Sequence, residues 1–160
     1  MALGLIGVAG GALGPAQAAS SSSRTVQRIP VEANPRLDRS GRRRIGKASF
    51  YAAMFAGRKM ADGTRMQPRG DNAASRTLPL GTTAVVTNLE TGRSAMVTIR
   101  DRGPYVAGRI VDLSPATAEE IGLDWRTGVT EVMVAPIVVP LPGGEFKLGA
   151  GALEARNNRY

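Results

Sequence analysis

The sequence contains no cysteine and no histidine among its 160 residues. Without these side chains the chain cannot form disulfides, cysteine nucleophiles, Ser-His-Asp triads or ordinary zinc sites. Aromatic residues are also scarce, at 4%, so a core must be built mainly from aliphatic side chains. Any catalysis must therefore use carboxylates, hydroxyls, lysine or arginine, and we expect neither a metal nor a cofactor.

Negative charge is scarce relative to positive charge. The chain has 21 Lys and Arg against 13 Asp and Glu, which gives a formal net charge of +8. This balance favours an anionic partner such as nucleic acid, a membrane surface or an acidic polymer. The length fits one domain with some flanking sequence.

The first 18 residues, MALGLIGVAGGALGPAQA, carry no charged side chain and end in Ala16-Gln17-Ala18. This small-x-small ending is typical of a secretory signal that is cleaved after Ala18, and a disordered apolar tail is the alternative. The segment is too short and too rich in glycine for a good transmembrane helix. No cysteine follows it, so no lipid can be attached there. We expect an exported protein of the periplasm or cell envelope, not lipid-anchored and with little access to nucleic acid.

Two further segments lack the pattern of a folded domain. Residues 19–44 are polar, contain Pro30 and Pro35 and have no apolar periodicity, which predicts a basic disordered linker. Its last residues, 42–44, are all arginine; such a run is either a solvated tether, the commoner case, or a contact for an anionic partner. Residues 137–160 have no clear pattern and predict an irregular C-terminal tail.

Residues 45–136 predict a small β domain. Two β-branched runs in TTAVVTNLETGRSAMVTIRD, residues 82–101, are joined by a turn around Gly92. Shorter strands are expected at 45–53, 108–114 and 128–136. Five or six short strands with little helix indicate a small closed barrel.

Local signals mark one tight turn and one helix in this region. Asp62-Gly63 lies between apolar flanks and predicts the turn. Ser114 is expected to cap a short helix that has Pro115 in its first turn and ends at Gly122. Asp112, just before this cap, is expected to be structural and to bond the start of the helix.

Asp101 is the carboxylate that stands out, because it ends a predicted strand just before a Gly-Pro turn. Successive strand side chains point to opposite faces, so Asp101 should continue the core-facing row of Val97 and Ile99. Partial burial favours the protonated carboxyl that a general acid needs, whereas a nearby guanidinium, from Arg102 or Arg109, favours the charged form. The alternative is a carboxylate that caps the turn or pairs with an arginine.

Five motifs of the β region follow one another in the order GKASFY, FAGRKMADG, ASRTLPLGT, VTNLETGRS and VTIRDRGPYVAGRIVDLS, over about residues 46–136. In this order they resemble the rare lipoprotein A (RlpA) family. The resemblance implies a mainly β protein: a small six-stranded double-psi β-barrel with one short helix, flanked by disordered or irregular termini. The same barrel forms the first domain of expansins.

The resemblance also implies an activity. Active members resemble lytic transglycosylases, which cut peptidoglycan glycan strands, preferring strands without stem peptides, and leave 1,6-anhydro-muramic acid ends. An acid protonates the glycosidic oxygen, and the resulting carboxylate then takes the proton of the sugar's C6 hydroxyl. One carboxyl can perform both steps, unlike the paired carboxylates of ordinary glycosidases. By its place in DRGPY, Asp101 matches the catalytic aspartate of the family.

The chain departs from the family at two positions linked to activity. Thr64 stands where the family typically has a glutamate, and Ser75 stands where it has a histidine. Neither side chain can transfer a proton near neutral pH, although both can hydrogen-bond a sugar hydroxyl. Asp62 is the nearest replacement acid, but an Asp-Gly turn explains it equally well.

Other residues are candidates for substrate binding. Arg102 and Arg109 are suited to bidentate binding of a lactyl carboxylate, with ordinary surface arginines as the alternative. Tyr51 and Tyr105 are candidate stacking faces for sugar rings.

Three classes of function fit these observations. The first is a peptidoglycan lytic transglycosylase with Asp101 as acid and base. The second is a non-catalytic peptidoglycan-binding barrel that lost turnover, which Thr64 and Ser75 favour. The third is an expansin-like wall-loosening or structural envelope protein. We favour the enzyme, acting as a monomer on glycan strands, with no nucleic-acid partner and no transmembrane segment in the mature protein.

Overall fold

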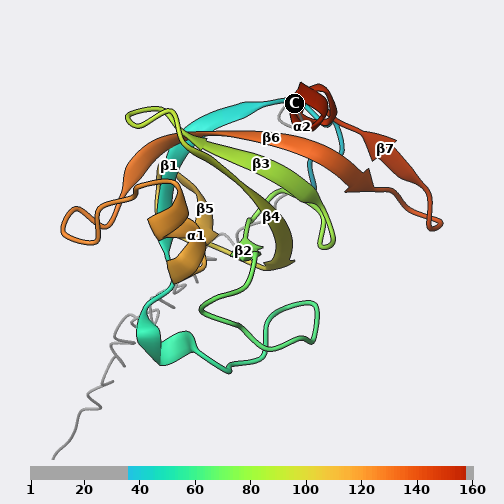
Figure 1. Cartoon of the computed structure of the whole chain (residues 1–160). Helices are drawn as coiled ribbons and strands as arrows, with labels where there is room; N and C mark the ends of the chain where they lie inside the picture. The colour runs from blue at the N-terminus through green and yellow to red at the C-terminus, as the bar shows by residue number, and fades with distance from the viewer. Residues whose placement is uncertain (1–35, 158–160) are drawn as a thin grey trace, which may run out of the picture. The chain divides into compact units, whose positions relative to one another are not determined.

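The computed structural model describes residues 36–157 (Figure 1). The expected signal segment at 1–18 and most of the expected linker lie outside these residues. The elements are β1 (Arg44–Phe50), the 3-10 helix η1 (Ala53–Phe55), β2 (Asn72–Ala74), β3 (Thr83–Asn88), β4 (Ser94–Asp101), β5 (Arg109–Leu113), α1 (Pro115–Glu120), β6 (Thr130–Pro140), β7 (Phe146–Leu148) and α2 (Gly151–Asn157).

Six of the strands form a closed barrel. They are hydrogen-bonded in the order β1-β5-β2-β4-β3-β6, and a further β1–β6 pairing closes the ring. The pairs β1–β5 and β2–β4 are parallel, and the other neighbours in the ring are antiparallel. The expected six-stranded barrel is therefore confirmed, and β7 extends it by pairing with the far end of β6.

Strand alternation fills the barrel with aliphatic side chains. On β4, Val97 and Ile99 are buried, whereas the side chain of Met96 points outward and is 60% exposed. Valine, isoleucine and alanine from every strand of the ring make up most of the main core. This core matches the expectation that few aromatics would contribute.

The helix α1 forms where its capping residues predicted it. Ser114 has extended backbone dihedrals, and its hydroxyl oxygen accepts a hydrogen bond from the Thr117 amide, while Pro115 occupies the first turn. Gly122 ends the helix with φ +72°, a conformation that glycine adopts without steric cost. Neither α-helix within residues 36–157 is long and apolar enough to span a bilayer.

The segments that flank the barrel are more ordered than the sequence indicated. In place of an irregular tail after residue 136, β6 continues to Pro140, β7 forms a hairpin with it, and α2 follows. Glycines allow this packing: a Cβ on Gly149 or Gly151 would lie 2.3 Å from a carbonyl oxygen of β6. The short helix α2 has no local signal of its own in the sequence, because its position depends on this close approach to a distant strand.

The described end of the expected linker also packs against the barrel. The Asp38 amide donates to the Thr77 carbonyl oxygen at 2.6 Å, and Gly41 is buried. The Gly41 carbonyl oxygen accepts from the Ala150 amide at 2.9 Å, and Arg43 forms an ion pair with Glu154 of α2. Residues 36–43 and 149–157 therefore hold each other, an arrangement we call the terminal clasp.

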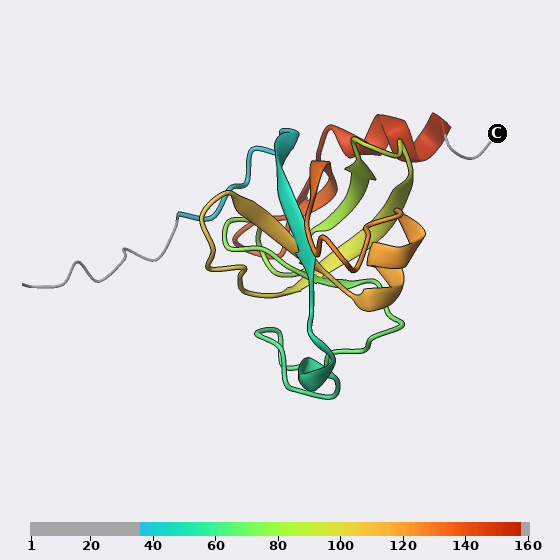
Figure 2. The same cartoon turned by 90° about the vertical axis from the view of Figure 1, so that its left-hand side faces the viewer.

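A long excursion between β1 and β2, residues 51–71, is called the site loop. Figures 1 and 2 both show it at the opposite end of the barrel from α2. It is anchored by a small apolar group separate from the main core, the loop cluster, which comprises Tyr51, Met60, Met66 and Ala74.

Candidate active site

A change of register near the end of β4 determines the face of the sheet to which the Asp101 side chain points. Ala73 pairs with Ile99, but a bulge follows and Ala74 pairs with Asp101. Ala73 and Ile99 belong to the main core, whereas Ala74 belongs to the loop cluster. Because an extra residue reverses the alternation of side chains, Asp101 leaves the core-facing row in which strand alternation had placed it. It faces the site loop instead.

The carboxylate of Asp101 is held by three hydrogen bonds. Its Oδ1 accepts from the amides of Ala61, at 3.0 Å, and Arg102, at 2.9 Å. Its Oδ2 accepts from the phenol of Tyr51 at 3.1 Å. Burial raises the pKa of Tyr51 above its ordinary value, and the neighbouring charge and hydrogen bond of Asp101 add to this. Tyr51 therefore stays protonated and donates to Asp101.

A second carboxyl lies in the same row of the sheet. Asp112 on β5 pairs with Ser49 of β1 on one side and with Ala74 of β2 on the other, and Ala74 in turn pairs with Asp101. Register partners point to the same face, so the side chain between the two carboxyls, on the intervening strand β2, is the methyl of Ala74. The sequence predicted that Asp112 bonds the start of the helix α1. This prediction was wrong, because the Asp112 Oδ1 accepts a hydrogen bond from the Ser49 hydroxyl.

The surroundings of Asp112 favour its protonated form. Burial raises the pKa of Asp112, and the charge of Asp101 adds to this effect. The hydrogen bond from Ser49 and the charge of Arg109 act in the opposite direction but do not cancel it. The sequence pattern does not reveal this property, because it depends on contacts between β1, β5 and β4.

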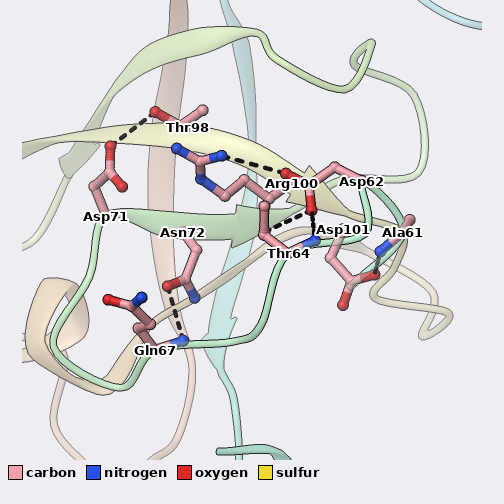
Figure 3. A network of polar contacts seen from close by, with 9 residues as sticks. All are labelled: Ala61, Asp62, Thr64, Gln67, Asp71, Asn72, Thr98, Arg100 and Asp101. Atoms are coloured by element: carbon pink, nitrogen blue, oxygen red, sulfur yellow. Dashed lines mark hydrogen bonds and ion pairs between the residues drawn. The ribbon is translucent and has the colours of Figure 1, made fainter. Parts of the chain in front are cut away.

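Asp62 caps the turn that carries Thr64 (Figure 3). Its Oδ1 accepts from the Thr64 amide at 2.8 Å and hydroxyl at 2.6 Å, and its Oδ2 lies 3.3 Å from Nη1 of Arg100. Burial alone would raise the pKa of Asp62, but the hydrogen bonds from Thr64 and Arg100 outweigh burial and lower it. Asp62 is therefore charged at neutral pH and is poorly suited to replace a missing acid.

A cavity of about 230 Å³ opens beside this turn. It is lined by Met60, Thr64, Arg65, Gln67, Gly70, Asp71, Asn72 and Arg100. Asn72 accepts from the Gln67 amide at 3.2 Å, while its own buried amide nitrogen has no partner among the described residues. Because an unpaired buried donor is costly, Asn72 is a candidate contact for a substrate oxygen, and sequence reasoning missed it.

Ser75 and Arg102 bind the backbone beyond β2. The Ser75 amide donates to the Asp101 carbonyl oxygen at 3.1 Å, and its hydroxyl accepts from the Leu78 amide at 3.2 Å. Arg102 Nη1 donates to the carbonyl oxygens of Ser75, at 3.0 Å, and Leu78, at 2.8 Å. Arg102 thereby fixes the segment 75–78 against the end of β4.

The expected site residues fall into three places. Tyr51, Asp62, Thr64 and Asp101 lie together under and along the site loop, where Tyr51 is buried and serves as a donor rather than an open stacking face. Ser75, Arg102 and Arg109 lie around the segment 75–78. Tyr105, in the β4–β5 connection, is 71% exposed. Within residues 36–157, no cluster of three or more Asp or Glu side chains is arranged to hold a metal ion.

The closed ring with its two parallel strand pairs and a carboxylate-centred polar site defines a class of protein: a double-psi β-barrel domain with a carboxylate site under a long loop. The family model for lytic transglycolases matches residues 44–134, and the chain belongs to this family.

Curated relatives agree with the resemblance to the rare lipoprotein A family. The endolytic peptidoglycan transglycosylase RlpA of Pasteurella multocida is 44% identical over 104 residues, which cover 65% of this chain and 35% of the relative. The protein of the same name from Pseudomonas aeruginosa is 40% identical over 103 residues, 64% of this chain and 30% of the relative. The chain thus spans about a third of the length of these relatives.

Among solved structures, the Streptomyces papain inhibitor superposes with a TM-score of 0.46 and 24% identity. The superposition covers 58% of this chain and 92% of the inhibitor.

Proposed function

We propose that the protein is a peptidoglycan lytic transglycosylase in which Asp101 is the acid and base. The observation that carries this proposal is the set of bonds around Asp101, in a domain whose relatives are named endolytic peptidoglycan transglycosylases. Two backbone amides fix Oδ1, which leaves Oδ2 as the oxygen able to carry a proton. The substrate is a glycan strand, preferentially one without stem peptides.

In the proposed reaction Asp101 donates one proton to the substrate and later accepts one proton from it. Asp101 protonates the glycosidic oxygen as the bond from C1 of the muramic acid breaks. The C6 hydroxyl oxygen of the same sugar then bonds to C1, and its proton returns to Asp101, which leaves a 1,6-anhydro end. A phenol can donate or accept, so Tyr51 can hold Oδ2 in both states of the carboxyl.

The remaining candidates have supporting roles in this proposal. Thr64 and Asn72 line the cavity beside the Asp62 turn. The Asn72 amide can donate to a sugar hydroxyl or acetamido oxygen, whereas the Thr64 hydroxyl, which donates to Asp62, can accept from a sugar hydroxyl. Tyr105 offers an exposed ring for stacking. Asp62 orients Thr64, and Ser75 and Arg102 position the end of β4. Arg109 binds an anionic group of the substrate.

The test is Asp101→Asn in the full chain, with Asp124→Asn, in the exposed turn before β6, as the matched control. Asparagine keeps the shape but cannot donate and then accept the proton. Release of 1,6-anhydro products from purified glycan strands should fall by roughly two to four orders of magnitude, while binding and the unfolding midpoint persist. Equal product release by wild type and Asp101→Asn would contradict the proposal.

A glycan-binding barrel without turnover is the second candidate. The hydroxyl of Thr64 donates to Asp62, and that of Ser75 accepts from backbone amides, so neither is set up as a proton carrier. In that case wild type and Asp101→Asn would both bind glycan strands and release no anhydro product. No observation on the described residues favours the expansin-like alternative.

The proposed location is the periplasm or cell envelope, reached by an exported form without a lipid anchor. Removal of residues 1–18 would leave 142 of the 160 residues. Mass spectrometry of envelope fractions checks this, and a purely cytoplasmic pool with an intact Met1 would contradict it.

A further inference from the structure

A second cavity, of about 180 Å³, is lined in part by the segment 75–78, which follows β2. We call it the arginine cavity. Its lining residues are Arg42, Arg44, Ser75, Arg76, Thr77, Leu78, Arg109, Ile110, Val134 and Pro136. They come from four separate stretches of chain: the start of β1, the segment after β2, the start of β5 and the middle of β6.

The rim of this cavity is strongly positive. Four arginines line it, and no carboxylate does. Within residues 36–157, only Arg44 of the four forms an ion pair, with Asp38 at 2.7 Å. The charge of Arg109 acts to lower the pKa of Asp112, with which Arg109 forms no ion pair in the part of the chain that the structure describes. Positive charges gathered in a concave surface raise the local concentration of anions. The cavity is therefore suited to an anionic ligand.

The floor and the size restrict which anion fits. Leu78, Val134 and Pro136 are buried and Ile110 partly so, which gives the cavity an apolar base. A volume of about 180 Å³ lies below the roughly 300 Å³ at which pockets for drug-sized ligands begin. The cavity therefore takes a small group rather than a whole sugar ring, with an apolar part inward and a charge at the arginine rim.

The cavity wall is bonded directly to the candidate active site. The Ser75 amide donates to the Asp101 carbonyl oxygen, and Arg102 Nη1 donates to the carbonyl oxygens of Ser75 and Leu78. Only the segment 75–78 would thus separate a ligand group in the cavity from the end of β4, where the proposed acid Asp101 is.

We propose that the arginine cavity binds a carboxylate on a short, methyl-bearing stem. Resting on the function proposed above, this group is the free lactyl side chain of a muramic acid residue whose stem peptide has been removed. A stem peptide converts the lactyl carboxylate into an amide, enlarges the group and places its nearest carboxylate at least one residue further out. The cavity therefore favours stripped strands through the position of the charge and the size of the group, with Arg42 and Arg76 as specificity-determining residues besides Arg109.

The experiment is an NMR titration of the full chain with three probes, followed at the amides of Thr77, Leu78 and Ile110. N-acetylmuramic acid carries the free lactyl carboxylate, N-acetylglucosamine lacks the lactyl group, and the primary amide of N-acetylmuramic acid carries the same stem without the charge. Only N-acetylmuramic acid should shift these resonances. Its affinity should fall by about tenfold or more in Arg42→Gln/Arg76→Gln, since charge-assisted contacts are lost. The charge-matched control Arg93→Gln/Arg126→Gln, at exposed positions away from the cavity, should bind like wild type.

The outcomes separate this proposal from the enzymatic one. Equal responses to the three probes, no response to N-acetylmuramic acid, or equal weakening in the two double variants would overturn the cavity proposal, whatever the cleavage assay gives. Inorganic phosphate that displaces N-acetylmuramic acid at equal concentration would also overturn it, because the cavity would then bind anions without recognising the lactyl stem. Selective, Arg42- and Arg76-dependent binding supports it even where wild type releases no anhydro product.

Discussion

Asp101 and Asp112 are chemically identical side chains in one row of the sheet, yet their contacts differ. Asp101 accepts from two backbone amides and a phenol at the edge of the site loop. Asp112 accepts from the Ser49 hydroxyl, and burial raises its pKa. The charge of Asp101 is one of the causes that raise the pKa of Asp112, so the two sites are coupled electrostatically.

The raised pKa of Asp112 has a consequence for stability. Above the ordinary aspartate value of 3.8, the folded protein retains a proton that the unfolded chain has lost. The free energy of unfolding should therefore decrease as pH rises from that value through the raised pKa, by at most about 1.4 kcal/mol per pH unit for one proton. Asp112→Asn keeps an acceptor for Ser49 and should remove this decrease.

Urea denaturation of wild type and Asp112→Asn between about pH 3.5 and 7 measures the effect. Asp124→Asn, at an exposed turn, is the control and should keep the wild-type pH profile. Parallel profiles for wild type and Asp112→Asn would show that Asp112 titrates alike in the folded and unfolded chain.

Thr64 provides a second prediction at this scale. Its side chain is exposed and lines the cavity beside Arg65 and Arg100, where a glutamate has room and opposite charges nearby. We expect Thr64→Glu, which supplies the acid that the resemblance to the rare lipoprotein A family implies at this position, to raise the rate of anhydro-product release. Thr64→Gln, of the same length but uncharged, is the control; equal rates for both variants would show that a second acid is not what limits turnover.

At the scale of elements, the short strand β2 organises the site. Its three residues pair with β4 on one side and β5 on the other, and the bulge between Ala73 and Ala74 turns Asp101 towards the site loop. Ala74 of β2 lies in register between Asp101 and Asp112 and places only a methyl between the two side chains. A larger residue there would fill the space between Asp101 and Asp112.

The packing of α2 on β6 can be tested by a glycine-to-alanine substitution, which adds a single methyl. A Cβ on Gly151 would lie 2.3 Å from the Ala135 carbonyl oxygen, which is backbone and cannot move aside as a side chain would. Gly151→Ala should therefore cost roughly 1–3 kcal/mol of unfolding free energy, measured by urea denaturation. Gly143→Ala, at φ +90° with open space around it, carries only the backbone cost and should lose less; equal losses would argue against the close contact.

Local sequence signals predicted the elements that depend on neighbouring residues. The β3–β4 hairpin and the capped helix α1 formed within a few residues of their expected bounds. The strand β2 is too short for alternation to reveal it, and α2 depends on glycine contacts with β6. Asp101 was found through its motif, but its partner Tyr51 is 50 positions away, and the arginine cavity joins four distant stretches. Such contacts follow from the closed ring and not from any window of sequence.

At the scale of the whole molecule, the net charge of +8 should govern retention on an anionic wall. Binding to purified sacculi should weaken steeply with salt, because the screening length falls from about 10 Å at 0.1 M to about 3 Å at 1 M. Co-sedimentation over this range measures it, with lysozyme-digested fragments too small to sediment as the background. Binding that does not change with salt would show that uncharged contacts, and not the net charge, hold the protein on the wall.

The terminal clasp makes the described chain nearly a closed circle. Arg43 and Glu154 are 111 positions apart in sequence yet form an ion pair, so a short linker could join the two ends without disturbing a strand. The circle could then be opened at the exposed turn of residues 90–92, between β3 and β4. Such a circular permutant would keep every strand neighbour of the barrel while changing which loops must close first. Its folding rate would change with the new order of loop closure, whereas the row from Ser49 to Asp101 and both cavities would remain intact.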